Sequence, residues 1–154
     1  MKIFFYSCLI ILISTKILCA QNIAKAYFAG GCFWCMEESF ENLNGVSEVV
    51  SGYSGGKTKN PTYKEVTYGD SGHFETIEVI YDSSVISYEK LLDNFWINID
   101  PFDEYGQFCD KGYSYRSVAF YQSKEQKIMI EESINKIQKK FEKKIRKKSS
   151  NFCK

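Results

Sequence analysis

The segment 73–82, HFETIEVIYD, is the part of the sequence that most restricts the fold. Polar and apolar residues alternate along it, and in an extended chain every second side chain lies on the same face. One face therefore carries Ile77, Val79 and Tyr81 together with Glu75. A carboxylate is unusual in such apolar company, which marks Glu75 as a candidate functional residue.

The rest of the chain alternates strand patterns with helix patterns. We predict further strands at 25–30, 46–53 and 116–122, helices at 33–43, at 87–98 and from Ser123 onward, and a short helical turn at 61–66. The stretch 100–115 has no regular period. Interleaved strands and helices predict an α/β fold, and the irregular stretches favour a mixed sheet over a regular parallel array.

The first 20 residues have the pattern of a secretory signal peptide. Lys2 precedes an apolar run at 3–13, and the small residue Ala20 precedes a polar one. The run is too short for a comfortable membrane span, and Lys16 follows it. We therefore predict a signal peptide at 1–20, one domain at 21–154, and a periplasmic or other extracytoplasmic location. A buried first helix or a retained anchor is the alternative.

Cysteine usage and charge limit the classes of function. Cleavage after Ala20 would remove Cys8 and Cys19, leaving Cys32, Cys35, Cys109 and Cys153. Four thiols are few for a disulfide-stapled scaffold, so redox chemistry fits the count better. A net charge of +1 argues against a nucleic-acid binder.

The segment AGGCFWCMEE places Cys32 after a predicted strand and two glycines, at the start of a predicted helix. Unpaired N–H groups and the helix dipole stabilise a thiolate at such a position. Gly30 and Gly31 allow a sharp turn and the close approach of a ligand. Cys32 is therefore a candidate nucleophile.

Three interpretations of this segment compete on the residues alone. C-x-x-C after a strand is typical of a thioredoxin-like oxidoreductase. A zinc module needs a second close pair of ligands, which Cys109, Cys153 and the single histidine, His73, do not supply, so we expect no metal. The third interpretation is a thiol peroxidase or reductase whose pocket Phe33 and Trp34 line.

Six segments between about residues 26 and 141 carry a family resemblance. They are GCFWCMEESF, SGYSGG, PTYKEV, GDSGHFETIEVIYD, NIDPFDEYGQFCDKG and SYRSVAFY. In this order they resemble the peptide methionine sulfoxide reductases of the A class. GCFW alone is moderately specific, but its combination with GY-x-GG, GH-x-E and YRS is strongly so. The resemblance implies a two-layer α+β sandwich related to the ferredoxin-like fold, and a peptide-methionine (S)-S-oxide reductase without a cofactor.

The resemblance also implies roles for individual residues. Cys32 would attack the sulfoxide sulfur and take over its oxygen as a sulfenic acid. Glu75 would protonate that oxygen, because partial burial raises the pKa of a carboxyl toward the value that a proton donor needs. The other matches are Tyr53 and Tyr115 for the hydroxyls that bind the oxygen, Phe33 and Trp34 for the methyl pocket, and Asp110 for a carboxylate that orients the peptide. His73 belongs to the motif, and we expect it to be structural.

The end of the chain departs from the family pattern. Many members resolve the sulfenic acid with a tail cysteine after a segment containing Asp-Tyr-His, whereas the basic stretch IRKKSSNFCK stands here. Cys109, Cys35 and Cys153 are the candidates to form the disulfide. Cys109 ranks first because it adjoins Asp110, and a helix is expected to hold Cys35 away from Cys32 unless its first turn loosens.

The expected partners follow from this chemistry. The substrate is methionine sulfoxide, free or in peptides and proteins, and a thioredoxin-like protein would reduce the enzyme's disulfide. We expect a monomer that repairs oxidised methionine under oxidative stress. A catalytically silent family member with an altered tail is the alternative.

Overall fold

The computed structural model describes the backbone of residues 22–150 and the side chains of residues 22–142. Its centre is a four-stranded sheet in the order β2-β3-β1-β6. The strands are β1 (Ile23–Ala29), β2 (Val46–Ser54), β3 (Phe74–Asp82) and β6 (Val118–Phe120). The predicted signal peptide at 1–20 and Cys153 lie outside the described residues.

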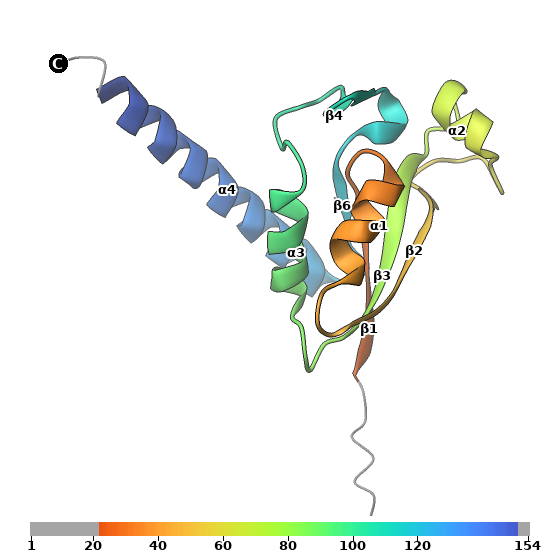
Figure 1. The fold of residues 1–154 in the computed structure, drawn as a ribbon, viewed down its shortest axis with the longest axis horizontal. Coiled ribbons are helices and arrows are strands. Elements are labelled where there is room, and N and C mark those ends of the chain that lie inside the picture. Colours follow the sequence, from red (N-terminus) through yellow and green to blue (C-terminus); the bar gives the residue numbers. More distant parts are fainter. Residues whose placement is uncertain (1–21, 151–154) are drawn as a thin grey trace, which may run out of the picture.

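The helices of the described residues are α1 (Phe33–Glu41), α2 (Tyr63–Tyr68), α3 (Tyr88–Ile97) and α4 (Lys124–Ser150). Of these four helices, α1 and α3 form the second layer (Figure 1). The ring of Phe28 in β1 stacks on Phe40 of α1 at 5.3 Å and on Phe95 of α3 at 5.1 Å, so these two helices share one face of the sheet. The long helix α4 packs against α3 and extends away from the sheet. In the part of the chain described, no helix is long and apolar enough to cross a membrane.

The topology confirms the α/β class and corrects one detail. The order of elements, β1-α1-β2-β3-α3-β6 with α2 inserted, and the strand order together give a ferredoxin-like arrangement. The sheet is antiparallel in all three of its pairings rather than mixed. Strands β1 and β2 do run in the same direction, but β3 lies between them, so no parallel ladder forms.

Local sequence signals account for the starts of two helices. Thr62 caps α2 through a capping box with Glu65. The Thr62 side chain accepts the backbone N–H of Glu65, and the Glu65 carboxylate accepts the backbone N–H of Thr62. Ser87 caps α3 by accepting the N–H of Lys90. These elements begin where their side chains supply partners for otherwise unpaired N–H groups.

The stretch 100–115 is more regular than its sequence predicts. It contains a hairpin of β4 (Gly106–Gln107) and β5 (Asp110–Lys111), followed by the 3₁₀ turn η1 (Tyr113–Tyr115). Gly106 makes the hairpin possible, because a Cβ at this position would lie 2.2 Å from the carbonyl oxygen of Asp110. Strands of two residues carry no detectable period, so sequence patterning missed them.

Candidate active site

Cys32 stands at the junction of β1 and α1, as the sequence predicts. It is the N-cap residue of α1, and its carbonyl accepts the N–H groups of Cys35 at 3.1 Å and Met36 at 3.2 Å. The preceding Gly31 has φ +90°, and a Cβ there would lie 2.8 Å from the Cβ of Gln107. Only glycine fits this turn without strain, and the turn sets the position of the thiol.

Glu75 lies beneath the first turn of α1, with 1% of its surface exposed. Its Oε2 accepts the N–H of Phe33 at 3.1 Å. Its Oε1 is buried and has no hydrogen-bond partner among the described residues. Burial raises the pKa of Glu75, the Phe33 N–H partly opposes that rise, and the negative charge of Asp110 adds to it. The site thus contains a buried carboxyl whose pKa is raised, and one of its oxygens has no hydrogen-bond partner among the described residues.

Two tyrosines lie close to this carboxyl. Tyr53 is the cross-strand partner of Glu75 in the β2–β3 ladder, so both side chains project from the same face. Burial and the charge of Glu75 raise the pKa of Tyr53. Burial, a hydrogen bond with Tyr63 and the charge of Glu75 raise the pKa of Tyr115. Both hydroxyls therefore keep their protons and can donate hydrogen bonds.

An aromatic cluster surrounds Phe33, whose side chain is buried. Its ring centroid lies 6.1 Å from that of Trp34, 5.8 Å from that of Tyr53 and 6.4 Å from that of Tyr63. Trp34 is 72% exposed, so one face of this cluster opens to solvent. The arrangement offers an apolar wall beside Cys32 that a ligand can reach.

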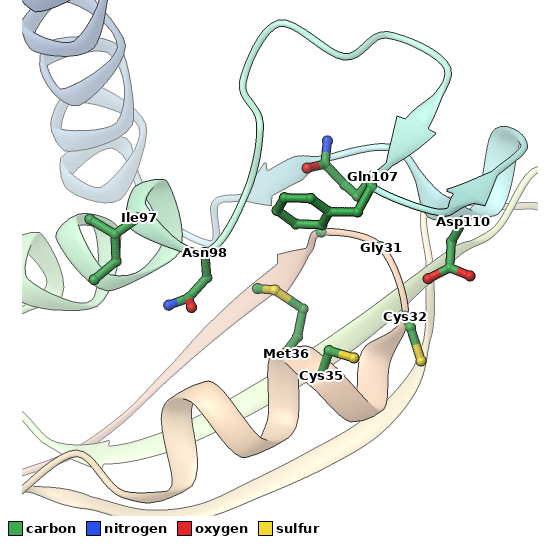
Figure 2. Close-up of a pocket in the computed structure, with 10 residues that line it drawn as sticks. Gly31, Cys32, Cys35, Met36, Ile97, Asn98, Gln107 and Asp110 are labelled. Atoms are coloured by element: carbon green, nitrogen blue, oxygen red, sulfur yellow. The ribbon is translucent and has the colours of Figure 1, made fainter.

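A cavity of about 350 Å³ opens on the other side of Cys32, toward the β4–β5 hairpin. Figure 2 shows Cys32 and Cys35 beside each other on the first turn of α1, with Asp110 across the cavity. The negative charge of Asp110 contributes to the raised pKa of Glu75 and to that of Cys35. Asp110 is therefore close to the reacting groups, as the family resemblance implies.

Cys35 lies close to Cys32, which is the exception that the sequence left open for a first turn that departs from helical geometry. Figure 2 shows the two side chains beside each other, and partial burial together with the neighbouring Cys32 thiol raises the pKa of Cys35. Cys32 has a non-helical ψ of 121° as the N-cap residue, which lets the two side chains meet three positions apart. The two sulfurs are free thiols in this structure.

Cys109 is exposed at the turn of the hairpin. Its neighbours Phe108 and Asp110 line the cavity, but Cys109 does not. The structure therefore brings Cys35, and not Cys109, to Cys32. Cys153, the third candidate, lies outside the described residues.

The imidazole of His73 makes structural contacts with the backbone of a neighbouring loop. Its Nδ1 accepts the N–H of Gly56 at 3.2 Å, and its Nε2 lies 2.9 Å from the carbonyl oxygen of Thr58. These contacts tie the loop after β2 to the start of β3, which carries Glu75. Within the described residues, no three His, Cys, Asp or Glu side chains form a group that could hold a metal ion.

Two residues of the site, Tyr63 and Gln107, were not predicted from the sequence. Tyr63 lies in the quoted segment PTYKEV, and it contacts both Phe33 and Tyr115. Gln107 is 1% exposed and lines the cavity. No local pattern distinguishes a buried glutamine from an exposed one, so the sequence carries no signal for Gln107.

Comparisons with known sequences agree with this geometry. The family model for peptide methionine sulfoxide reductase matches residues 24–153. The chain is 52% identical over 113 residues to peptide methionine sulfoxide reductase MsrA of Listeria monocytogenes, covering 73% of this chain and 64% of that protein. It is 48% identical over 114 residues to MsrA of Streptococcus agalactiae, covering 74% and 68%. The chain thus spans a little under two thirds of the length of its Listeria relative.

Solved structures give the same result. Methionine sulfoxide reductase A of Corynebacterium diphtheriae superposes with a TM-score of 0.68 at 30% identity, covering 74% of this chain and 54% of that one. Reduced Mxr1 of Saccharomyces cerevisiae superposes with a TM-score of 0.65 at 33% identity, covering 75% and 70%. The chain belongs to the peptide methionine sulfoxide reductase family.

Proposed function

We propose that this protein reduces methionine sulfoxide, free or within peptides and proteins, to methionine. The observation that carries the proposal is the pairing of Cys32 with Glu75, a buried carboxyl of raised pKa, at one helix start. A thiol–disulfide oxidoreductase needs no such acid, whereas a sulfoxide oxygen must be protonated before it can leave sulfur. The names of the similar proteins support the same activity.

The first step transfers the oxygen. The Cys32 thiolate attacks the sulfoxide sulfur, and Glu75 gives its proton to the oxygen. The bond between oxygen and the substrate sulfur breaks, and a bond between oxygen and the Cys32 sulfur replaces it. Methionine leaves, and Cys32 remains as a sulfenic acid. The free Oε1 of Glu75 supports this role, because a bound sulfoxide oxygen would be its missing partner.

The surrounding side chains bind the substrate. The protonated hydroxyls of Tyr53 and Tyr115 donate hydrogen bonds to the sulfoxide oxygen as negative charge grows on it. Phe33 and Trp34 contact the methyl group through the apolar wall. Asp110 accepts a backbone N–H of the peptide. The raised pKa values of both tyrosines support their part in this scheme.

Cys35 then resolves the sulfenic acid. Its sulfur attacks the Cys32 sulfur, the S–O bond breaks, and the hydroxyl leaves with the thiol proton as water. The closeness of the two thiols, which line the same cavity, supports this assignment over Cys109, which does not line it. A thioredoxin-like dithiol reduces the disulfide by exchange. We further propose that the enzyme is an exported monomer, on the basis of its N-terminal sequence and its composition.

Turnover of a methionine sulfoxide peptide with dithiothreitol tests the proposal. The unaltered protein and Cys109→Ser should both turn over, whereas Cys32→Ser should be inactive. Full activity of Cys32→Ser would contradict the mechanism. A silent family member would show no turnover, although the peptide would still protect Cys32 from alkylation.

A peptide map after one equivalent of substrate tests the resolving step. We expect a disulfide between Cys32 and Cys35. Thioredoxin-driven turnover should fall strongly in Cys35→Ser, whereas the first turnover, read as methionine formed per enzyme, should remain. A disulfide between Cys32 and Cys109 would reject Cys35 as the resolving thiol and leave the first step intact.

A further inference from the structure

Two exposed apolar side chains stand at the cavity beside Cys32 and have no part in the proposed chemistry. Ile97, the last residue of α3, is 78% exposed, and Phe108, at the turn of the hairpin, is 68% exposed. Both line the same cavity, and Met36, which is 2% exposed, lines it from α1. Single exposed apolar residues are common, but here two of them and a buried methionine line one open cavity.

The cavity is separate from the group that would hold the sulfoxide. Cys32 lines it, but Trp34, Tyr53 and Glu75 do not. Its volume of about 350 Å³ lies in the range of pockets that bind small ligands, roughly 300–1,000 Å³. Because Cys32 lines the cavity and also lies beside the aromatic cluster, a residue adjacent to a methionine sulfoxide that reacts with Cys32 is within reach of the cavity.

Polar groups at the cavity fit the backbone of such a peptide. The side-chain amide of Asn98 donates to the carbonyl of Asn94 at 2.8 Å, which leaves its own oxygen to accept an N–H. Figure 2 shows Asn98 and Asp110 on different sides of the cavity, one from the end of α3 and one from the hairpin. The carboxylate of Asp110 also disfavours a negatively charged occupant.

We propose that this cavity binds an apolar side chain adjacent to methionine sulfoxide in a peptide, with Ile97 and Phe108 determining the preference. The inference rests on the proposed function and adds a substrate class to it: sulfoxides flanked by an aliphatic or aromatic residue. Free methionine sulfoxide lacks the occupant. A neighbouring glutamate would be rejected by Asp110.

Pentapeptides test the inference. Each contains one methionine sulfoxide with glycine, leucine or glutamate on one side and glycine elsewhere, and kcat/KM is measured with excess dithiothreitol. We expect a leucine peptide to exceed the glycine peptide about tenfold, as partial burial of a leucine side chain predicts. The glutamate peptide should fall below the glycine peptide.

Variants connect the preference to the cavity. In the double variant Ile97→Ala, Phe108→Ala, the leucine-to-glycine ratio of kcat/KM should drop below about twofold. The matched control, Val85→Ala with Ile128→Ala, removes two other exposed apolar side chains and should keep the tenfold ratio. Equal kcat/KM for the leucine and glycine peptides in the unaltered protein would overturn the inference while leaving the proposed function intact.

Two further results separate the alternatives. If the double variant slows thioredoxin-driven turnover but keeps the leucine preference, the surface serves the reductant and the inference is overturned. If no sulfoxide is turned over, the proposed function fails. Protection of Cys32 from alkylation then shows whether the cavity still prefers the leucine peptide over the glycine peptide. The leucine peptide should protect at about a tenfold lower concentration than the glycine peptide, and equal protection would overturn the inference.

Discussion

The first turn of α1 and the β4–β5 hairpin face each other across the cavity, but different forces hold them. Cys32 and the underlying Glu75 belong to elements that the sheet ladder and the aromatic core fix from below. The hairpin has two-residue strands, and its Phe108 and Cys109 are exposed. A reacting acid needs a desolvated, fixed position, whereas groups that select a peptide must be accessible to it.

One buried side chain anchors the hairpin. The Oε1 of Gln107 accepts the N–H of Asp100 at 2.6 Å, and its Nε2 donates to the Asp100 carbonyl at 2.9 Å. An ion pair between Lys111 and Asp103 also stabilises the hairpin, but weakly, because Lys111 is exposed and water screens the two charges. The hairpin therefore depends on a few polar contacts, and the helix start on many apolar ones. Substitutions in the two regions should affect different quantities.

The largest expected effect concerns the acid. Glu75→Gln keeps an acceptor for the Phe33 N–H but cannot give a proton, so kcat should fall about 10²–10³-fold. Glu78→Gln is the matched control, because Glu78 lies on the opposite face of β3 and pairs with Lys25 at 2.8 Å. Steady-state kinetics on one peptide compare them. An equal loss in both variants would remove Glu75 from the mechanism.

The next effect concerns the turn that positions Cys32. Gly31→Ala places a Cβ at φ +90° and within 2.8 Å of Gln107, which should lower the free energy of unfolding by about 3 kcal/mol. Gly52→Ala is the control, because a Cβ there meets nothing within 4 Å. Urea denaturation measures both variants. A loss below about 1 kcal/mol for Gly31→Ala would mean that the turn adapts.

The sequence allowed prediction of the helix-start half of the site better than the hairpin half. The period of two in β3 identified the buried face of Glu75, and glycines before Cys32 identified the turn, because both signals are local. The antiparallel order of the sheet depends on β3 pairing with strands distant in sequence, which no local pattern encodes. The closeness of Cys35 to Cys32 depends on one backbone ψ at the N-cap. Regular helix spacing alone predicts that the two side chains lie apart.

A smaller effect is expected at the hairpin anchor. Gln107→Ala leaves the N–H and carbonyl of Asp100 without these partners, so the free energy of unfolding should fall by about 2 kcal/mol. Because Asp110 follows in the same hairpin, KM for a peptide should rise more than kcat falls. Gln138→Ala, an exposed position on α4, should change neither quantity. A fall in kcat alone would assign Gln107 to the chemical step instead of the hairpin.

The smallest expected effect is a difference in how stability depends on pH. Burial raises the pKa of Glu75 above its unfolded value of about 4.3, so its contribution is fully present below that pH and is lost as pH rises through the folded pKa. The Lys25 and Tyr27 hydrogen bonds lower the pKa of Glu78, whose contribution is present above about pH 4.3 and is lost as pH falls through the folded pKa.

Denaturation curves at a series of pH values measure these opposite slopes. Relative to the unaltered protein, Glu75→Gln should gain stability as pH rises, by at most about 1.4 kcal/mol per pH unit. Glu78→Gln should lose less than the unaltered protein as pH falls through the acid range. Slopes of the same sign would show that Glu75 is solvated in the folded protein, and the contrast between the buried acid and the partly exposed Glu78 on β3 would fail.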